Sequence, residues 1–319
     1  MSKYLGIAKK NIIFVKNFCK VLFYKPKDIP VPSFSGWNDT LVCHKISKEK
    51  RDIPKIIWFF WDKFEKPTIV KATIERVKEL NPDHKVNLLS YDNINEYMDF
   101  SSLETKDASI QHKSDLIRLE LLSRYGGFWC DATCIFNESF EWVHKINREN
   151  YHDLIGYYRA RDTLVTDYPI IENWFLACHP DNEFIAKWKR EVQTVISLGT
   201  KKYYQNLLER PDFNSIAQGS DRGEYHSVYF ACQLAMRATP NFSFYLRKAE
   251  AGPYLYQETI QWDREKIAAI ICRLPIFSKI PPVIKLTYSN RYLLPALIKF
   301  GLVKKHSILG NFLSILDDR

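Results

Sequence analysis

Hydrophobic and polar positions divide the middle of the chain into alternating extended and helical stretches. The run "IPKIIWFFW", which begins at Ile53 and contains Pro54, is short and apolar, as is typical of a buried strand. Residues 67–80 then show the spacing of a helix, which stops at Asn81. "KVNLLSY" predicts the next strand, and a short helix is expected near residues 93–98. This alternation predicts an α/β domain with a mostly parallel central sheet.

The same two patterns recur further along the chain. We expect later strands at residues 154–157 and 174–178, and helices at residues 182–197 and 225–237. The sequence has no internal repeat and no low-complexity segment.

The stretch "SDLIRLELLSRYGGFWCDAT", residues 114–133, places charges in a strongly apolar helix. Asp115 and Arg118 are three residues apart and can share one face of a helix that is apolar around most of its circumference. An isolated buried charge is costly, so these two residues either form a structural ion pair or face a polar cavity.

Gly126 and Gly127 end this helix and turn the chain directly into the strand "FWCD". Asp131 is therefore expected at the carboxyl end of a strand, which is where ligands bind in open α/β sheets. A carboxylate there can hold Mg²⁺ or Mn²⁺, the usual bridge to a nucleotide pyrophosphate. Capping a turn is the common role of a single strand-end aspartate, but a charged helix beside it indicates a ligand site.

Both ends of the chain are apolar and basic. The first 24 residues fit a helix whose lysines lie opposite its apolar face, as in a helix at a membrane interface or one packed on the protein's own core. The far end, "RYLLPALIKFGLVKKHSILGNFLSIL", repeats this composition, so the two ends either form one membrane-docking surface or belong to the core. The expected apolar face consists of Leu5, Ala8, Ile12, Val15, Cys19 and Leu22, and the opposing lysines are Lys9, Lys16 and Lys20.

A segment rich in proline and serine, "KPKDIPVPSFSGW", predicts a linker between the first helix and the main domain. We therefore expect an amphipathic N-terminal helix and linker at residues 1–36, the α/β domain at residues 37–290, and a basic apolar helical tail at residues 291–319.

Composition and charge narrow the class of protein. Of 319 residues, 46% are hydrophobic and 14% aromatic, which excludes a disordered chain. The net charge of +9 indicates an anionic partner, such as a phosphate-bearing substrate or an acidic membrane surface. Nucleic acid is not expected, because no helix-turn-helix, zinc-finger or RRM signature is present.

The seven cysteines show no paired CxxC spacing, so we expect reduced, mostly buried thiols in a cytoplasmic protein. A secretory signal is not expected, because lysines interrupt the first apolar segment. No apolar run reaches the roughly 20 residues that a membrane span needs.

The quoted blocks resemble the capsular polysaccharide synthesis glycosyltransferases, which are related to glycosyltransferase family 32 and share a "DxD" motif. The resemblance covers roughly residues 53–288 and includes "IPKIIWFFW", "HKSDLIRLELLSRYGGFWCDAT", "IENWFLACHPDNEFIAKW" and "PPVIKLTY". It implies a single nucleotide-binding domain of GT-A fold that uses a sugar nucleotide and a divalent metal, Mn²⁺ or Mg²⁺. The central block is specific, whereas "PPVIKLTY" is weak on its own.

Carried over by position, the resemblance implies roles for several residues. Trp61 would stack on the donor's base, although an indole in this strand can equally be core. Asp115 and Arg118 would grip hydroxyls of the transferred sugar. Asp131 would contact the metal and the donor's ribose or phosphate. Thr133 stands at the second metal-binding position, where many relatives have aspartate, so the metal would need further ligands from phosphate, water or the C-terminal region.

The remaining candidates bind the donor or the acceptor. His112 would donate to a phosphate or orient Asp115, with a capping or core role as the alternative. Asn173 and Trp174 would line the sugar or acceptor pocket, although Trp174 equally fits the core. His226 is a candidate for the phosphates or the acceptor. Lys285 would neutralise the departing diphosphate, unless it is an exposed structural lysine.

The implied reaction has positive charge on the sugar and growing negative charge on the diphosphate. The resemblance implies a hexosyltransferase that uses a UDP-hexose with retention of configuration, and no nucleophile is identified. The acceptor would be a lipid-linked capsular polysaccharide or O-antigen unit, with the enzyme peripheral at the inner face of a bacterial membrane. The alternative is a non-catalytic sugar-binding or scaffold protein of a polysaccharide synthesis complex. A phosphoryl-transfer enzyme is disfavoured, because no GxxxxGK[ST] loop is present.

Overall fold

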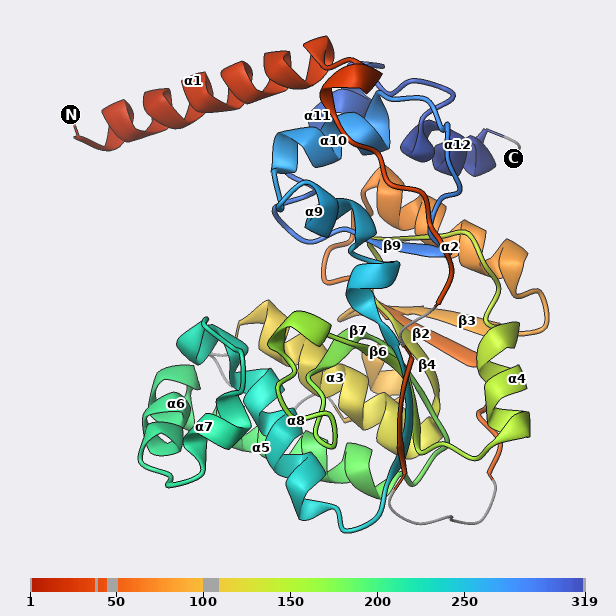
Figure 1. Cartoon of the computed structure of the whole chain (residues 1–319), viewed down its shortest axis with the longest axis vertical. Coiled ribbons are helices and arrows are strands. Elements are labelled where there is room, and N and C mark those ends of the chain that lie inside the picture. Colours follow the sequence, from red (N-terminus) through yellow and green to blue (C-terminus); the bar gives the residue numbers. More distant parts are fainter. Residues whose placement is uncertain (1, 38–39, 45–50, 100–108, 318–319) are drawn as a thin grey trace.

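The computed structural model describes residues 2–37, 40–44, 51–99 and 109–317, with the backbone alone for residues 2–10 and 44 (Figure 1). A seven-stranded sheet in the order β1-β8-β6-β7-β4-β2-β3 forms its centre. Five strands run in one direction, and β1 and β7 run against them, which confirms the predicted α/β class with a mostly parallel sheet. The strands are β1 (Thr40–His44), β2 (Ile56–Phe60), β3 (Lys85–Leu89), β4 (Gly127–Cys130), β6 (Leu154–Tyr158), β7 (Ile171–Cys178) and β8 (Ser243–Lys248).

Helices cover both faces of this sheet, which explains why strands β2 and β4 are apolar throughout. In β2, Ile57 and Phe59 belong to one core cluster, whereas Trp58 and Phe60 belong to another on the opposite face. The second cluster includes the inner sides of three helices, α3 (Ile110–Tyr125), α5 (Glu183–Leu198) and α8 (Ser227–Ala238). The first includes α2 (Thr68–Leu80), α4 (Glu141–Glu149), α10 (Arg264–Cys272) and α12 (Ile308–Leu313).

A second, two-stranded sheet brings the C-terminal part of the chain beside β4. Strand β5 (Cys134–Phe136) follows β4 almost directly and pairs antiparallel with β9 (Val283–Lys285). The pairing sets Cys134 opposite Lys285, so the turn that contains Asp131 is flanked by residues from both parts of the chain. The remaining helices are α6 (Thr200–Leu208), α7 (Phe213–Ala217), α9 (Leu255–Thr259) and α11 (Leu294–Lys299).

The two glycines that follow α3 have the backbone shape that the turn requires. Gly126 and Gly127 have φ angles of 62° and 86°, which side-chain-bearing residues rarely adopt. A Cβ atom on Gly127 would also collide with the carbonyl oxygen of Ile56 on the neighbouring strand. The double glycine therefore allows a helix to end and a central strand to begin without a connecting loop.

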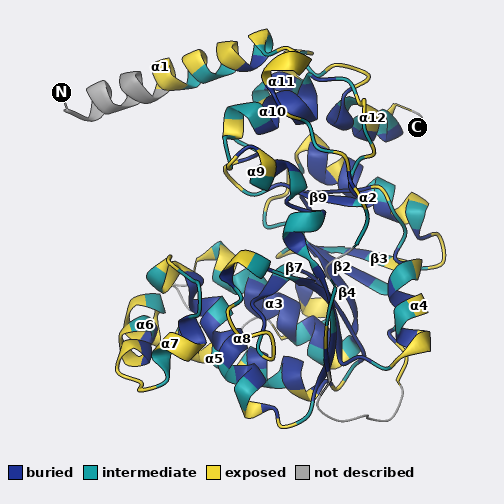
Figure 2. Ribbon diagram, viewed as in Figure 1, coloured by how far each residue is buried: buried dark blue, intermediate teal, exposed yellow. Residues whose placement is uncertain are grey.

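The N-terminal helix α1 (Ser2–Phe23) extends away from the rest of the molecule (Figures 1 and 2). Its Phe14 and Phe18 contact Tyr292 and Phe300 of the C-terminal tail, and Val21 is fully buried. Of the predicted apolar face, Leu22 is partly buried against the first cluster, whereas the other residues with described side chains point away from the body. Ile12, Val15 and Cys19 are exposed, and exposed Lys16 and Lys20 follow them on the adjacent side of the helix instead of lying opposite. The side chains of Leu5, Ala8 and Lys9 lie outside the described residues.

The tail itself belongs to the core. Leu294, Leu297, Leu309 and Phe312 are buried against the first cluster, which favours the core alternative for this segment. Within the described ranges, no helix is both long and apolar enough to cross a bilayer.

The predicted linker is packed against the body, because Ile29 and Phe34 are buried and the backbone N–H of Phe34 donates to the carbonyl of Lys279 (2.8 Å). The division of the chain into three segments stays a prediction. All seven cysteines are free, and six of them are buried, as expected.

Candidate functional site

Asp131 leaves strand β4 at its carboxyl end and is surrounded by hydrogen-bond donors. Its backbone N–H donates to the carbonyl of Trp174 (2.9 Å). Its Oδ1 accepts from Nη2 of Arg118 (3.1 Å) and from the indole Nε1 of Trp129 (3.2 Å), and its Oδ2 accepts from the ammonium of Lys285. Arg118 and Lys285 thus hold the carboxylate in place. Because the side chain is 28% exposed, the carboxylate can still be reached from solvent.

Helix α3 supplies the second carboxylate and the guanidinium that connects the two acids. Nη1 of Arg118 donates to Oδ1 of Asp115 (2.5 Å), which also accepts from Nδ2 of Asn173 (2.9 Å) on β7. The guanidinium carbon lies 4.8 Å from the ring centre of Trp129, a stacking distance that restricts the arginine further. Asp115, Arg118, Asp131, Asn173 and Lys285 thus form one continuous set of contacts, here called the site cluster.

The two acids of the site cluster differ in pKa. Burial raises the pKa of Asp115, and the nearby Arg118 only partly offsets this effect. Burial acts in the same direction on Asp131, but Lys285 and Arg118 outweigh it and hold the pKa of Asp131 below its ordinary value. Arg291 is also close enough to be affected by the charge of Asp131, although burial lowers the pKa of this arginine. Asp131 is therefore an ionised group within a predominantly cationic environment.

These residues do not form a metal-binding set by themselves. Both oxygens of Asp131 already accept hydrogen bonds from cationic groups. Thr133 is buried, and its hydroxyl lies 3.4 Å from the carbonyl oxygen of Leu286, to which it donates. In the described part of the chain, no three His, Cys, Asp or Glu residues are grouped to hold a metal ion. The donor set thus does not fit a Mn²⁺ or Mg²⁺ ion held by protein side chains.

Trp61 lies at the same edge of the sheet as Asp131. It follows β2, which runs parallel to β4 with Trp58 opposite Trp129, and its backbone N–H donates to the carbonyl of Leu89 (2.9 Å). The indole is partly buried, and its Nε1 has no hydrogen-bond partner among the described residues. An indole at this edge is suitably placed to offer a face to a ligand that also reaches Asp131.

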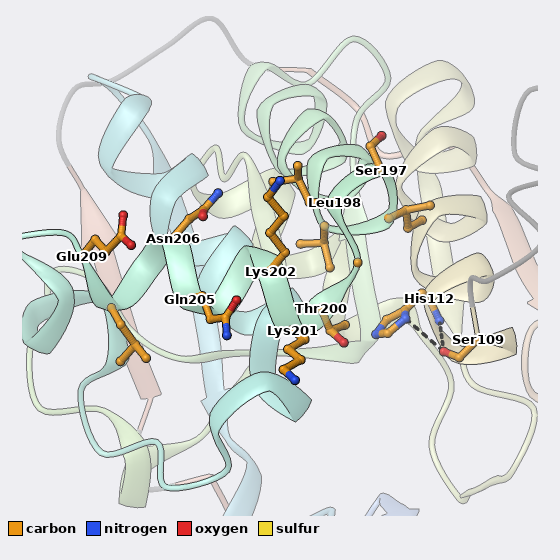
Figure 3. Close-up of a pocket in the computed structure, with 14 residues that line it drawn as sticks. Ser109, His112, Ser197, Leu198, Thr200, Lys201, Lys202, Gln205, Asn206 and Glu209 are labelled. Atoms are coloured by element: carbon orange, nitrogen blue, oxygen red, sulfur yellow. Dashed lines mark hydrogen bonds between the residues drawn. The ribbon is translucent and has the colours of Figure 1, made fainter.

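His112 lies outside the site cluster. Ser109 caps α3 by accepting from the backbone N–H of His112 (3.3 Å), and its hydroxyl is also hydrogen-bonded to Nδ1 of the ring (3.0 Å). Both residues line a cavity of about 1120 Å³ between the start of α3, the end of α5 and α6 (Figure 3). The cavity's other polar lining includes Thr200, Lys201, Lys202, Gln205 and Asn206. A positive charge on His112 would lower the pKa of Asp115, which lies one helical turn away.

Two further candidates are buried away from solvent. Trp174 is 1% exposed and stacks on Tyr157 with ring centres 4.8 Å apart, as a core residue does, although the ammonium of Lys285 lies 5.9 Å from its ring centre. Nδ1 of His226 is hydrogen-bonded to the hydroxyl of Ser220. Burial, assisted by Arg159 and another nearby arginine, lowers the pKa of His226 to about 4, so the ring is neutral at pH 7.

Sequence reasoning missed Trp129 and Arg291, which both act on Asp131. Trp129 has a local signal, because residues two apart on a strand point to the same side and Trp129 is two residues before Asp131. Arg291 has no such signal, since it lies outside the blocks that carry the family resemblance.

Comparisons with known proteins agree with the pattern in the sequence. A profile of the family described as "Capsular polysaccharide synthesis protein" matches residues 38–202, just over half of the chain. The curated protein "O-glycosyltransferase braB" of Annulohypoxylon truncatum is 30% identical over 164 residues. That match covers 46% of this chain but only 37% of the relative.

A solved structure, "PaToxG Glycosyltransferase", covers 98% of this chain and 96% of its own, with 14% sequence identity and a TM-score of 0.35. So loose a superposition carries no argument about fold or activity, and the fold rests on the sheet topology described above.

Proposed function

Because the chain belongs to the capsular polysaccharide synthesis protein family, we propose that it is a glycosyltransferase that moves a sugar from a nucleotide-sugar donor to a carbohydrate acceptor. One observation carries the proposal. At the carboxyl edge of the sheet, Asp131 meets Arg118 and Lys285 within hydrogen-bond reach, and Trp61 ends the neighbouring parallel strand. Ligands of α/β proteins bind at this edge, and the excess of positive charge suits a diphosphate.

Each part of the donor has a matching group in the site. The face of Trp61 suits a nucleobase. The cationic groups of Lys285 and Arg118 suit the diphosphate, on which negative charge grows as the glycosidic bond breaks. Asp115 and Asn173 are hydrogen-bonding groups suited to sugar hydroxyls, and they would stabilise positive charge on the sugar ring. The donor that we propose is a UDP-hexose, transferred with retention of configuration.

The proposed acceptor is a lipid-linked polysaccharide unit at the inner face of a membrane. Helix α1 supports a peripheral location, because Ile12 and Val15 are 68% and 57% exposed while the opposite side of the helix packs on the tail. Exposed Lys16 and Lys20 adjoin this apolar strip and would face anionic headgroups. Deleting residues 1–24 should move the protein out of the membrane fraction. An unchanged distribution would contradict this location.

Donor hydrolysis tests the proposed activity. UDP-, GDP- and CMP-sugars are incubated with the protein, with and without Mn²⁺, and released nucleotide is measured. Asp131→Ala should lower turnover about 100-fold, because the cations at the diphosphate lose the carboxylate that positions them. Asp83→Ala, which removes an exposed carboxylate paired with Lys55, is the matched control and should retain activity. If no donor is turned over and no nucleotide binds, the chain is better described as a non-catalytic scaffold.

A further inference from the structure

Lys285 is built into the site rather than resting on its surface. It is 8% exposed, and its strand β9 pairs with β5 immediately after the turn that carries Asp131. The backbone N–H of Lys285 donates to the carbonyl of Pro253 (3.0 Å), and its own carbonyl accepts from Nε2 of Gln257 (2.6 Å). These contacts fix the backbone on both sides of the strand, so the ammonium has a defined position at Oδ2 of Asp131.

The charges around Asp131 disfavour a divalent cation at the same place. A metal ion bound to this carboxylate would have to displace Lys285, and it would then face the guanidinium of Arg118, which lies 3.1 Å from Oδ1. Arg291 adds a third positive charge near Asp131. Like charges at such distances repel strongly when they are partly shielded from water. Thr133 contributes no negative charge to offset this repulsion, because its hydroxyl is neutral and already donates to a backbone carbonyl.

We infer that Lys285 occupies the place of the divalent cation, so that the site binds the donor's diphosphate through its ammonium and without a metal. The inference rests on the proposed function and specifies how the same site holds its donor. An ammonium has three N–H donors. One can remain on Asp131 while others reach phosphate oxygens, with Arg118 sharing the negative charge from the opposite side. Lys285 forms no covalent bond with the donor.

Binding of UDP measured by calorimetry tests the inference without relying on turnover. The wild-type chain should bind UDP in EDTA, and excess Mn²⁺ should not strengthen this binding. Lys285→Met should weaken binding in EDTA about 10- to 100-fold, the range expected for loss of a charge-assisted hydrogen bond. Lys145→Met is the control, because Lys145 is an exposed lysine on α4, and it should leave binding unchanged.

A second measurement does not depend on the folding of any variant. Mn²⁺ is titrated into the wild-type protein with and without UDP, and free Mn²⁺ is followed by electron paramagnetic resonance. We expect no more Mn²⁺ to be bound than by UDP alone. UDP binding that is lost in EDTA and restored by Mn²⁺, or Mn²⁺ held by the protein, would overturn the inference and leave the proposed function intact. Failure of every nucleoside diphosphate to bind in either condition would contradict the proposed function, and the inference with it.

Discussion

Two neighbouring residues of β7 belong to two different clusters of buried charge. Asn173 joins the site cluster through Asp115, whereas Glu172 lies 3.3 Å from Nε of Arg159 and accepts hydrogen bonds from the hydroxyls of Tyr229 (3.3 Å) and Tyr254 (3.2 Å). The second group, here called the Glu172 cluster, also contains Asp162, which pairs with Arg159 (3.2 Å) and Arg161 (3.3 Å).

The two clusters differ in exposure and in charge balance. The Glu172 side chain is 1% exposed, and three carboxylates meet two arginines there once Glu258, which lies 3.7 Å from Arg161, is included. The Asp131 side chain is 28% exposed, and the two carboxylates of the site cluster contact Arg118 and Lys285, while Arg291 is close enough to interact electrostatically with Asp131. A buried cluster without excess positive charge stabilises a fold, whereas a partly exposed cluster with excess positive charge can take up an anion. Buried charge alone therefore does not identify a site.

The largest expected effect is a loss of stability when the Glu172 cluster is disrupted. Glu172→Ala removes the partner of Arg159 and the acceptor of two tyrosine hydroxyls, so it should lower the free energy of unfolding by about 3 kcal/mol. Urea denaturation measures this change, and Glu172→Gln, which keeps an acceptor, should cost less. UDP affinity of the folded protein should stay the same. A variant with normal stability and lost UDP binding would show that Glu172 contributes to ligand binding, which would contradict the distinction between the two clusters.

A pH dependence of the free energy of unfolding, of similar size, is expected from His226, which is close enough to Arg159 of the Glu172 cluster to be affected by its charge. Its pKa is about 4 in the folded chain against 6.5 for an ordinary histidine, so between these values the unfolded chain binds more protons. Stability conferred by the neutral ring is complete above pH 6.5 and is lost as the pH falls toward 4, by up to roughly 3 kcal/mol. The difference between wild type and His226→Gln in denaturant midpoint across this range isolates the effect. Parallel pH curves would show that the pKa of His226 is the same in the folded and unfolded chain, which would contradict this prediction.

The smallest expected effect concerns Trp61, which is proposed to bind the base of a ligand held by the site cluster. Trp61→Ala should weaken UDP binding about tenfold, since stacking of a base on an aromatic ring is worth roughly 1–3 kcal/mol. Trp61→Phe should retain most of the affinity, because a flat aromatic face remains. Calorimetry with UDP and with inorganic diphosphate separates the base from the phosphates. Equal losses for both ligands would mean that the indole supports the fold instead of contacting the base.

The sequence predicted the parts of the site that depend on local structure. Asp115 and Arg118 share a helix, and the double glycine carries the chain from that helix into β4, so the relation of both residues to Asp131 follows from nearby sequence. Helix α3 begins at Ile110, earlier than expected, because Ser109 caps it. The short helix expected at residues 93–98 is a 3₁₀ turn, Ile94–Glu96.

The long-range contacts could not be derived from periodicity. Lys285 meets Asp131 across 154 positions, and only the family resemblance drew attention to it. Strands β1 and β8 were missed because each is stabilised by pairing with a distant strand rather than by an alternating pattern of its own. His112 was expected to donate to a phosphate or orient Asp115, or else to have a capping or core role; its ring is hydrogen-bonded to the Ser109 hydroxyl and lines the cavity beside α6, and its role in ligand binding stays a prediction.

The crystal structure of the chain with UDP bound tests the central claim most directly. We expect the diphosphate at the carboxyl end of β4, hydrogen-bonded to Lys285 and Arg118, with uracil on the face of Trp61 and no metal ion between Asp131 and the phosphates. UDP bound in the cavity beside α6, or with its phosphates out of reach of both Lys285 and Arg118, would contradict this prediction.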